Sequence, residues 1–330
     1  MNSHTSGDQK KVLILGASGY LGQHIALTFL KMGWQVVGLG TRVLNSSKNF
    51  EAWGEYTYLQ GDITQAHVQQ SAVDVLPDVV IFCIALDHES SEKNFSRALQ
   101  LNVESLWRFL EKVGKSTSRP VKMIYLSSVQ VYGELSGEVC EDHDLSPRNV
   151  YGLTHLLAER ILLAGAAQGY NSAVAVRVSN GYGPPVQPTS SCWPLVLNDF
   201  CRSAFREKKV KLKSDGKPCK DFIFVDDIAN GVATLATNET DVKTVNFCSG
   251  RTYNLIDLAI TVTEEFGKYF GEDIPILNAD DIVIPKTRDA AVSPPFVFDV
   301  GLLQKLGIRM NTHIRSGIQL LFKSLERGSQ

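Results

Sequence analysis

The amino-acid sequence predicts an α/β fold in which a doubly wound parallel sheet is followed by a smaller, mixed C-terminal lobe. Short apolar runs rich in β-branched residues alternate with longer segments of helical periodicity through the first half of the 330 residues. The runs are apolar throughout, which is typical of strands that helices cover on both faces. A glycine-rich turn joins the first run to the first helical segment.

The expected strands are short and continuously apolar, whereas the expected helices repeat their apolar residues about every 3.6 positions. The strands are predicted at 12–15, 35–39, 79–83, 123–126 and 173–176. The helices are predicted at about 19–32, 95–113 and 152–166. Beyond Arg177 the pattern changes to Gly, Pro and Ser punctuation. That half is predicted to consist of loops with short helices, laid over the carboxyl ends of the strands.

Composition excludes several classes of function. Apolar residues make up 44% of the chain, charged residues 21%, and the net charge of −2 argues against nucleic-acid binding. No apolar run approaches the roughly 18 residues that span a bilayer, and residues 1–9 are polar with no signal-peptide pattern. The six cysteines are scattered without a CxxC pair, which favours reduced thiols over disulfides or zinc. We expect a cytoplasmic protein with no metal, no nucleic-acid partner and no membrane association.

The glycine-rich turn, residues 16–22, lies between the first strand and the first helix. In such a turn the first glycine permits the bend, the second lets the backbone approach a pyrophosphate, and the third lets helix and strand pack closely. The helix N-terminus adds unpaired N–H groups and the positive end of its dipole. The pattern indicates a Rossmann dinucleotide-binding unit. Its candidate cofactor-binding residues are Gly16, Ser18, Gly19, Tyr20, Leu21 and Gly22.

The end of the second strand predicts which dinucleotide binds. NAD-binding units usually place an Asp or Glu there to hold the ribose 2′-hydroxyl. Here the run ends Gly40-Thr41-Arg42, so the acid is missing and a guanidinium suited to a 2′-phosphate stands nearby. We therefore expect NADP, with NAD as the alternative. Asp62 and Ile63 follow at a position where a loop is expected to meet the adenine, with Asp62 accepting from its exocyclic amine.

These patterns divide the chain into two parts. The dinucleotide-binding Rossmann domain is expected over residues 8–180, with a returning segment at about 222–250. Residues 181–221 and 251–330 are expected to form the substrate-binding lobe.

Several motifs are ordered and spaced as in one known family. They are the glycine turn at 16–22, Asn102-Val103, residues 127–133, residues 151–155, residues 177–180 and residues 221–227. In this order the chain resembles the extended short-chain dehydrogenase/reductase family of nucleotide-sugar epimerases, dehydratases and reductases. The resemblance runs from about residue 10 to residue 307 and implies an NAD(P)-dependent enzyme.

The resemblance also implies the catalytic groups. A Ser or Thr after the fourth strand and a Tyr on the next helix share a proton with the reacting oxygen, and Ser128 and Tyr151 match them. The family's lysine, four residues after the tyrosine, lowers the tyrosine pKa and holds the nicotinamide ribose; here it is replaced by His155, and no Tyr-x-x-x-Lys occurs in the chain. The resemblance therefore also makes Tyr151 and His155 candidate cofactor-binding residues. A lysine pulls the tyrosine pKa down from about 10, whereas histidine is charged only below about 6.5. Asn102 matches an asparagine with a helix-positioning role.

On the substrate side, the resemblance implies that Asn180 reaches a substrate diphosphate. Lys220 stands where the family usually has an arginine, and Arg288 matches a second basic residue on the diphosphate. Two convergent cations suit a nucleotide diphosphate, although a lysine lacks the bidentate fork of arginine. Ser128 is expected to contact the reacting group of the substrate as well.

The choice of reaction follows from what is missing. The acidic pair of the family's dehydratases is replaced by Val129 and Gln130, and the acid of its NAD-retaining epimerases is absent. We therefore expect an NADPH-dependent reductase of a keto-sugar nucleotide, with an epimerase that retains NAD(P) as the alternative. A catalytically degenerate NADP-binding sensor or scaffold is the alternative of another class. A homodimer through the helices at 95–113 and 152–166 is also expected from the resemblance.

The His155→Lys variant is expected to keep or raise activity at alkaline pH. A lysine stays protonated there and favours the Tyr151 phenolate, whereas a histidine loses its charge. The pH–rate profiles of the wild type and the variant check this. A variant that folds and is inactive at every pH would contradict a role for His155 beside the tyrosine.

Overall fold

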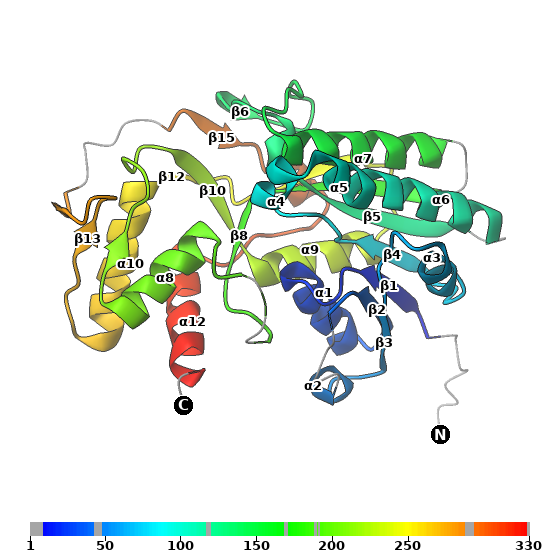
Figure 1. Cartoon of the computed structure of the whole chain (residues 1–330), viewed down its shortest axis with the longest axis horizontal. Coiled ribbons are helices and arrows are strands. Elements are labelled where there is room, and N and C mark those ends of the chain that lie inside the picture. The colour runs from blue at the N-terminus through cyan, green and yellow to red at the C-terminus, as the bar shows by residue number, and fades with distance from the viewer. Residues whose placement is uncertain are drawn as a thin grey trace. The chain divides into compact units, whose positions relative to one another are not determined.

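The computed structural model divides the chain into two compact units (Figure 1). The described residues are 9–42, 48–116, 120–167, 171–187, 190, 192–287 and 294–328. The first unit comprises residues 1–134, 144–177 and 229–245, and the second comprises residues 135–143, 178–228 and 246–330.

A seven-stranded sheet with the strand order β11-β7-β5-β4-β1-β2-β3 forms the centre of the first unit. Its strands are β1 (Lys11–Leu15), β2 (Gln35–Gly40), β3 (Tyr56–Gln60), β4 (Val79–Phe82), β5 (Val121–Ser128), β7 (Asn171–Val178) and β11 (Thr244–Phe247), whose last two residues fall in the second unit. The pairing is parallel, with Leu13 opposite both Val37 and Val80. The order reverses at β1 and β4, as in a doubly wound sheet. The predicted fold class is therefore confirmed.

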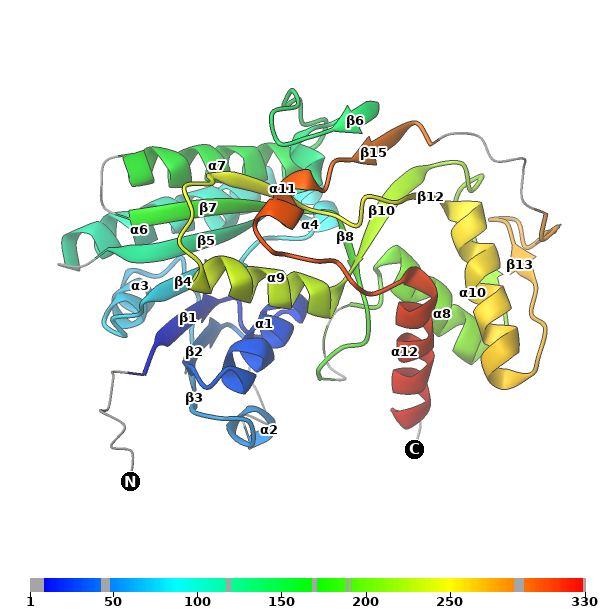
Figure 2. The same cartoon turned by 180° about the vertical axis from the view of Figure 1, so that it is seen from behind.

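Helices cover both faces of this sheet (Figures 1 and 2). They are α1 (Tyr20–Lys31), α2 (Lys48–Glu51), α3 (Ala66–Val73), α4 (His88–Lys93), α5 (Phe95–Ala98), α6 (Ser105–Ser116), α7 (Val150–Ala167) and α9 (Val225–Thr237), which enters the first unit at Ala229. Figure 2 shows α6 and α7 on one face and α1 on the other. Leu13 of β1 packs with Leu106 and Phe109 of α6 in one buried cluster. Val12 and Ile14 point to the opposite face and are fully buried as well.

The predicted helix at 95–113 is interrupted. Between α5 and α6 the chain forms a π-helical segment, Leu99–Glu104, which contains the fully buried Asn102. Such π-bulges re-aim a side chain within a helix and are frequent at functional sites. Leu106, for which the sequence leaves a dimer contact and a contact with the sheet equally open, lies in the core against the sheet.

The second unit contains small sheets and a packed group of helices. Its strands are β6 (Gly137–Val139), β8 (Asn180–Tyr182), β9 (Val210–Lys211), β10 (Cys219–Phe224), β12 (Thr252–Asn254), β13 (Ile276–Leu277), β14 (Val283–Ile284) and β15 (Phe296–Phe298). Its helices are α8 (Val196–Glu207), α10 (Leu255–Phe270), α11 (Gly301–Lys305) and α12 (Ile314–Arg327). The expectation of only short helices here is wrong, because α8, α10 and α12 have 12, 16 and 14 residues. Their apolar stripes pack on one another through Phe200, Phe266 and Phe322.

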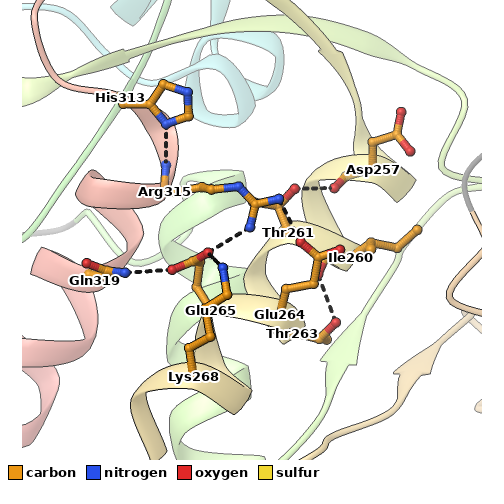
Figure 3. Close-up of polar contacts among 10 residues, drawn as sticks. All are labelled: Asp257, Ile260, Thr261, Thr263, Glu264, Glu265, Lys268, His313, Arg315 and Gln319. Atoms are coloured by element: carbon orange, nitrogen blue, oxygen red, sulfur yellow. Dashed lines mark hydrogen bonds and ion pairs between the residues drawn. The ribbon is translucent and has the colours of Figure 1, made fainter. Parts of the chain in front are cut away.

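A buried carboxylate joins α10 to α12 (Figure 3). The Glu265 side chain is 1% exposed and accepts from Arg315, at 2.7 Å, and from Gln319, at 2.6 Å. Lys268 donates to it at 2.8 Å. Burial alone would raise the pKa of Glu265, but these donors outweigh it and hold the pKa below its ordinary value. This contact sets the orientation of α10 relative to α12, which helix propensity alone does not determine.

The segment at 135–143 leaves the first unit, which the sequence did not suggest. Its strand β6 pairs in parallel with β15, with Gly137 opposite Phe296 and Val139 opposite Phe298. The chain returns to the first unit at residues 229–245. Among the described residues, no helix is both long and apolar enough to cross a membrane. In the same part of the chain, no three His, Cys, Asp or Glu side chains gather as metal ligands.

Candidate active site

The glycine turn forms a tight cradle at the start of α1. Gly16 has φ +95°, and a Cβ there would lie 3.1 Å from the carbonyl carbon of Cys83, so only glycine fits without strain. A Cβ at Gly22 would lie 2.9 Å from Cα of Ala17 and closer still to the Gly16 carbonyl oxygen. Gly19 caps α1 without a side-chain hydrogen bond, and the first turn carries no acid. The helix therefore presents backbone donors and its positive end beside the turn.

The end of β2 lies against this turn. A Cβ at Gly40 would lie 3.1 Å from Cβ of Ser18 and 2.8 Å from the Tyr58 hydroxyl. Tyr58 donates to the carbonyl oxygen of Arg42 at 2.7 Å and is hydrogen-bonded to the side chain of Ser18. Arg42 itself is exposed. The turn, the end of β2 and β3 thus enclose a small polar region that contains hydroxyls and one guanidinium.

Asp62 is engaged in local hydrogen bonds. Its Oδ1 accepts from the backbone N and the hydroxyl of Thr64, at 2.9 and 2.8 Å, and its Oδ2 pairs with Arg97 at 3.0 Å. Burial would raise the pKa of Asp62, but these bonds hold it below its ordinary value. The carboxylate stays ionised and partly exposed, and its contact with adenine remains a prediction. Ile63 is 1% exposed and belongs to the core below the sheet edge.

Local packing brings Tyr151 to Ser128. Ser128 ends β5, and its hydroxyl accepts from the backbone N of Gln130 at 3.2 Å, which begins the short turn Val129–Val131. Asn149 accepts from the backbone N of Gly152 at 2.7 Å at the start of α7. A Cβ at Gly152 would lie 2.5 Å from the Gln130 carbonyl oxygen, so a glycine is needed for this approach. The result is a hydrogen bond between the side chains of Ser128 and Tyr151.

Tyr151 is held as a neutral phenol. Burial, and after it the carboxylate of Asp87, raise the pKa of Tyr151 to about 12, while the hydrogen bond from Ser128 acts in the opposite direction. Asp87 caps α4 by accepting from Ser90. The ring of His88 lies 6.3 Å from that of Tyr151, centroid to centroid. The sequence reasoning missed Asp87 and His88, because only the docking of α4 beside α7 brings them to the tyrosine.

His155 is 2% exposed, and its ring stands edge-on to Tyr151 with 4.4 Å between centroids. Burial lowers the pKa of His155 to about 3, so the imidazole is neutral at pH 7. A protonated His155, which would stabilise a Tyr151 phenolate, is therefore not formed at that pH. Nδ1 lies 2.7 Å from the Tyr125 hydroxyl, and Nε2 has no hydrogen-bond partner within the described residues.

Asn102 ties the loop after β4 to α7. Its Oδ1 accepts from the backbone N of Leu86 at 2.8 Å, and its Nδ2 donates to the Thr154 hydroxyl at 3.0 Å. Thr154 in turn donates to the Tyr151 carbonyl oxygen at 3.0 Å. The geometry gives Asn102 the helix-positioning contacts that the resemblance implied, and the π-helical segment is what turns it inward.

The substrate-side residues Asn180 and Lys220 belong to the second unit, where β8 pairs with β10. Asn180 donates through Nδ2 to the Asp221 carbonyl oxygen at 2.8 Å. Lys220 is half-buried, burial lowers its pKa, and no carboxylate within the described ranges pairs with it. Such an unneutralised cation is suited to an anionic ligand. Arg288 lies outside the described residues.

Asp221 has a structural role. It is 1% exposed and accepts from the Ser179 hydroxyl at 2.6 Å, from the Ser249 backbone and hydroxyl, and from the Arg251 backbone at 3.1 Å. Burial raises the pKa of Asp221, and these donors oppose that rise. The carboxylate fixes the strand that carries Lys220.

A nicotinamide dinucleotide fits the first unit on three observations. The glycine cradle admits a backbone approach. The hydroxyls of Ser18 and Tyr58 lie beside the end of β2, which continues to Arg42 and has no acid, and His155 Nε2 is a buried polar atom without a partner in the described residues. Gly16, Ser18, Gly19, Tyr20, Leu21 and Gly22 would hold the phosphates.

Comparison with known proteins agrees with this arrangement. The model of the NAD dependent epimerase/dehydratase family matches residues 12–255. Uncharacterized UDP-glucose epimerase YtcB of Bacillus subtilis (strain 168) is 23% identical over 270 residues, with 78% of this chain and 83% of the relative covered. The dTDP-4-dehydro-6-deoxyglucose reductase of Escherichia coli is 23% identical over 326 residues, with 95% and 97% covered.

Solved structures show the same architecture. MoeE5 in complex with UDP-glucuronic acid and NAD superposes with a TM-score of 0.78 at 25% identity, covering 96% of this chain and 99% of MoeE5. UDP-glucose 4-epimerase of Thermotoga maritima, with UDP-glucose, gives a TM-score of 0.80 at 18% identity, covering 97% and 100%. The latter is a likeness of fold.

The folding stability of the protein should depend on the ionisation of His155. Its pKa is about 3 when folded against 6.5 when free, so the unfolded state binds more protons between these values. The contribution is complete above pH 6.5 and is lost as the pH falls toward 3. Urea unfolding at pH values from about 7.5 to 5 should show the wild type losing stability faster than His155→Gln, by at most about 1.4 kcal/mol per pH unit. Parallel curves would show that His155 titrates normally in the fold.

Proposed function

The chain belongs to the NAD dependent epimerase/dehydratase family, and from that membership we propose that it is an NADPH-dependent reductase of a keto-sugar nucleotide. The relatives are nucleotide-sugar epimerases, dehydratases and reductases of the extended short-chain dehydrogenase/reductase type. The observation that carries the direction of the reaction is the Ser128–Tyr151 pair, in which the tyrosine is a protonated phenol.

The residues at the end of β2 favour NADP over NAD. An acid that would hold a 2′-hydroxyl and repel a 2′-phosphate is absent from Gly40-Thr41-Arg42. The Arg42 guanidinium and the hydroxyls of Ser18 and Tyr58 are the groups that would contact the phosphate. Asp62 and Ile63 are the proposed contacts of the adenine.

The chemistry divides between cofactor and chain. When bound, the reduced nicotinamide supplies the hydride that adds to the carbonyl carbon. Ser128 donates a hydrogen bond to the carbonyl oxygen and polarises it, and Tyr151 gives that oxygen its proton. The phenolate left behind regains a proton from solvent. A tyrosine with a pKa of about 12 is protonated at neutral pH, which is the state that a proton donor requires and that a base does not have.

The substrate proposal rests on the second unit. Lys220 is a half-buried cation without a carboxylate partner among the described residues, and Asn180 retains its side-chain oxygen for a further contact. We assign both to a nucleotide diphosphate, with Arg288 as a second cation. The name of the Escherichia coli relative, dTDP-4-dehydro-6-deoxyglucose reductase, supplies a concrete first substrate to test.

An epimerase that retains NAD(P) is the second candidate. The observation in its favour is that curated relatives include a dTDP-L-rhamnose 4-epimerase, 23% identical over 299 residues. An epimerase must first oxidise a hydroxyl, which requires Tyr151 as a base, and the neutral His155 gives that base no charge assistance. A binding protein without turnover would also have Ser128, Tyr151 and His155.

A homodimer remains a prediction, for which the exposed Trp107, Leu153 and Leu157 on α6 and α7 are candidate contacts.

The Tyr151→Phe variant should lose turnover and keep the cofactor. With dTDP-4-dehydro-6-deoxyglucose as the probe, the wild type should oxidise NADPH, and the variant should be slower by about 10²- to 10⁴-fold because the proton donor is gone. Absorbance of NADPH gives the rate, and fluorescence titration gives its affinity. Tyr269→Phe, which removes an exposed hydroxyl on α10, is the matched control with unchanged rate. NADPH binding without turnover on a panel of keto-sugar nucleotides would favour the sensor, and cofactor retained through gel filtration would favour the epimerase.

Arg42→Ala should weaken NADPH binding and leave NADH binding unaltered. Loss of a charge-assisted contact to a phosphate corresponds to about a 10- to 100-fold higher Kd. Fluorescence titration of cofactor-stripped protein measures both affinities, with Arg108→Ala on the surface of α6 as the control. Equal binding of the two cofactors by the wild type, or a preference for NADH, would overturn the NADP assignment and put the epimerase first.

A further inference from the structure

One helical turn after Tyr151, where the family has a lysine, this chain has the imidazole of His155. His155 is buried at 2% exposure, edge-on to the Tyr151 ring. Its ring is hydrogen-bonded across to β5, where Nδ1 lies 2.7 Å from the hydroxyl of Tyr125. The two residues are 30 positions apart in sequence, so the contact exists only because α7 packs on β5.

The direction of that hydrogen bond follows from what surrounds Tyr125. The side chain is fully buried, and within the described residues His155 is the one side-chain partner of its hydroxyl. A buried hydroxyl hydrogen that found no acceptor would cost free energy, so the phenol donates and Nδ1 accepts. Burial, and after it repulsion of a Tyr125 phenolate by the ionised forms of Tyr151 and Glu159, raise the pKa of Tyr125 well above its ordinary value, which keeps the proton on the donor. Glu159 is itself paired with Arg177 at 2.9 Å.

A neutral imidazole carries one proton, so acceptance at Nδ1 places that proton on Nε2. Nε2 is buried and has no partner within the described residues. A buried N–H donor of this kind is suited to an acceptor oxygen brought by a ligand. The lysine that the resemblance implies at this position would hold the ribose beside the nicotinamide, so a ribose hydroxyl is the acceptor that the proposed function supplies.

We propose that Tyr125 is a positioning residue, which holds His155 in the neutral tautomer with the proton on Nε2 and so aims one N–H donor at a hydroxyl of the nicotinamide ribose. The inference rests on the proposed function for the identity of the ligand, whereas the tautomer belongs to the chain alone. In this proposal the Tyr125–His155 pair orients the ribose, as the family's lysine does, but it supplies no positive charge.

The tautomer is tested first, on cofactor-free wild-type protein. Nitrogen-15 NMR of labelled histidine rings distinguishes a protonated from an unprotonated ring nitrogen, and the His155→Gln spectrum identifies the resonances of His155. The expected result is an unprotonated Nδ1 and a protonated Nε2. The opposite assignment would overturn the proposal, and this measurement holds even if no variant of Tyr125 folds.

Tyr125→Phe tests the role, because it removes only the hydroxyl. The expected result is a mixture of tautomers at His155 and a Kd for NADPH raised by about three- to tenfold, the size of one lost hydrogen bond. The matched control is Tyr56→Phe, a buried tyrosine of the same unit whose hydroxyl has no partner in the described part of the chain. It should change neither quantity. A Tyr125→Phe protein with an unchanged tautomer and unchanged Kd would contradict the positioning role.

The two proposals fail in different ways. In the first case, the wild type shows the expected tautomer, Tyr125→Phe binds NADPH more weakly, and the wild type turns over no keto-sugar nucleotide. This result would contradict the proposed function and support the positioning role. In the second case, Tyr125→Phe turns over the keto-sugar nucleotide, and its His155 tautomer and NADPH affinity are those of the wild type. This result would support the proposed function and contradict the positioning role.

Discussion

The buried ion pair between Glu159 on α7 and Arg177 on β7 is the contact on which the site depends most. The two charges are 2% and 4% exposed, and their closest atoms lie 2.9 Å apart. Glu159 also accepts from the Ser127 hydroxyl at 2.5 Å, and Arg177 donates to the Tyr132 hydroxyl at 2.8 Å. Burying two charges is favourable only with such complete hydrogen bonding. The network therefore permits one placement of α7 against the end of β5.

That placement determines the chemistry above it. Ser128 follows Ser127 directly, and Tyr151 and His155 lie two turns and one turn before Glu159 on α7. Arg177 compensates the charge of Glu159, whereas the Asp87 carboxylate acts on Tyr151. Burial then raises the pKa of Tyr151 to about 12 and lowers that of His155 to about 3. The same packing that orders the site makes both groups neutral.

A neutral site of this kind separates the two tasks that one lysine performs elsewhere in the family. Orientation is left to hydrogen bonds, from Asn102 through Thr154 to the start of α7, and from Tyr125 to His155. No cation lowers the pKa of Tyr151 among the described residues, and the Asp87 carboxylate raises it. The arrangement is suited to a phenol that donates its proton.

The sequence by itself determined the alternation of apolar strands and helices, the glycine turn, the serine and tyrosine, and the missing lysine, because these are local patterns in the chain. It did not determine the length of helices such as α10, whose apolar face is recognised only once α8 and α12 pack on it. It also did not reveal Asp87 beside Tyr151, the strand pair β6–β15, or the neutral state of His155. Only the tertiary structure decided these, because a residue's charge and partners depend on what buries it, and the burying groups are distant in sequence.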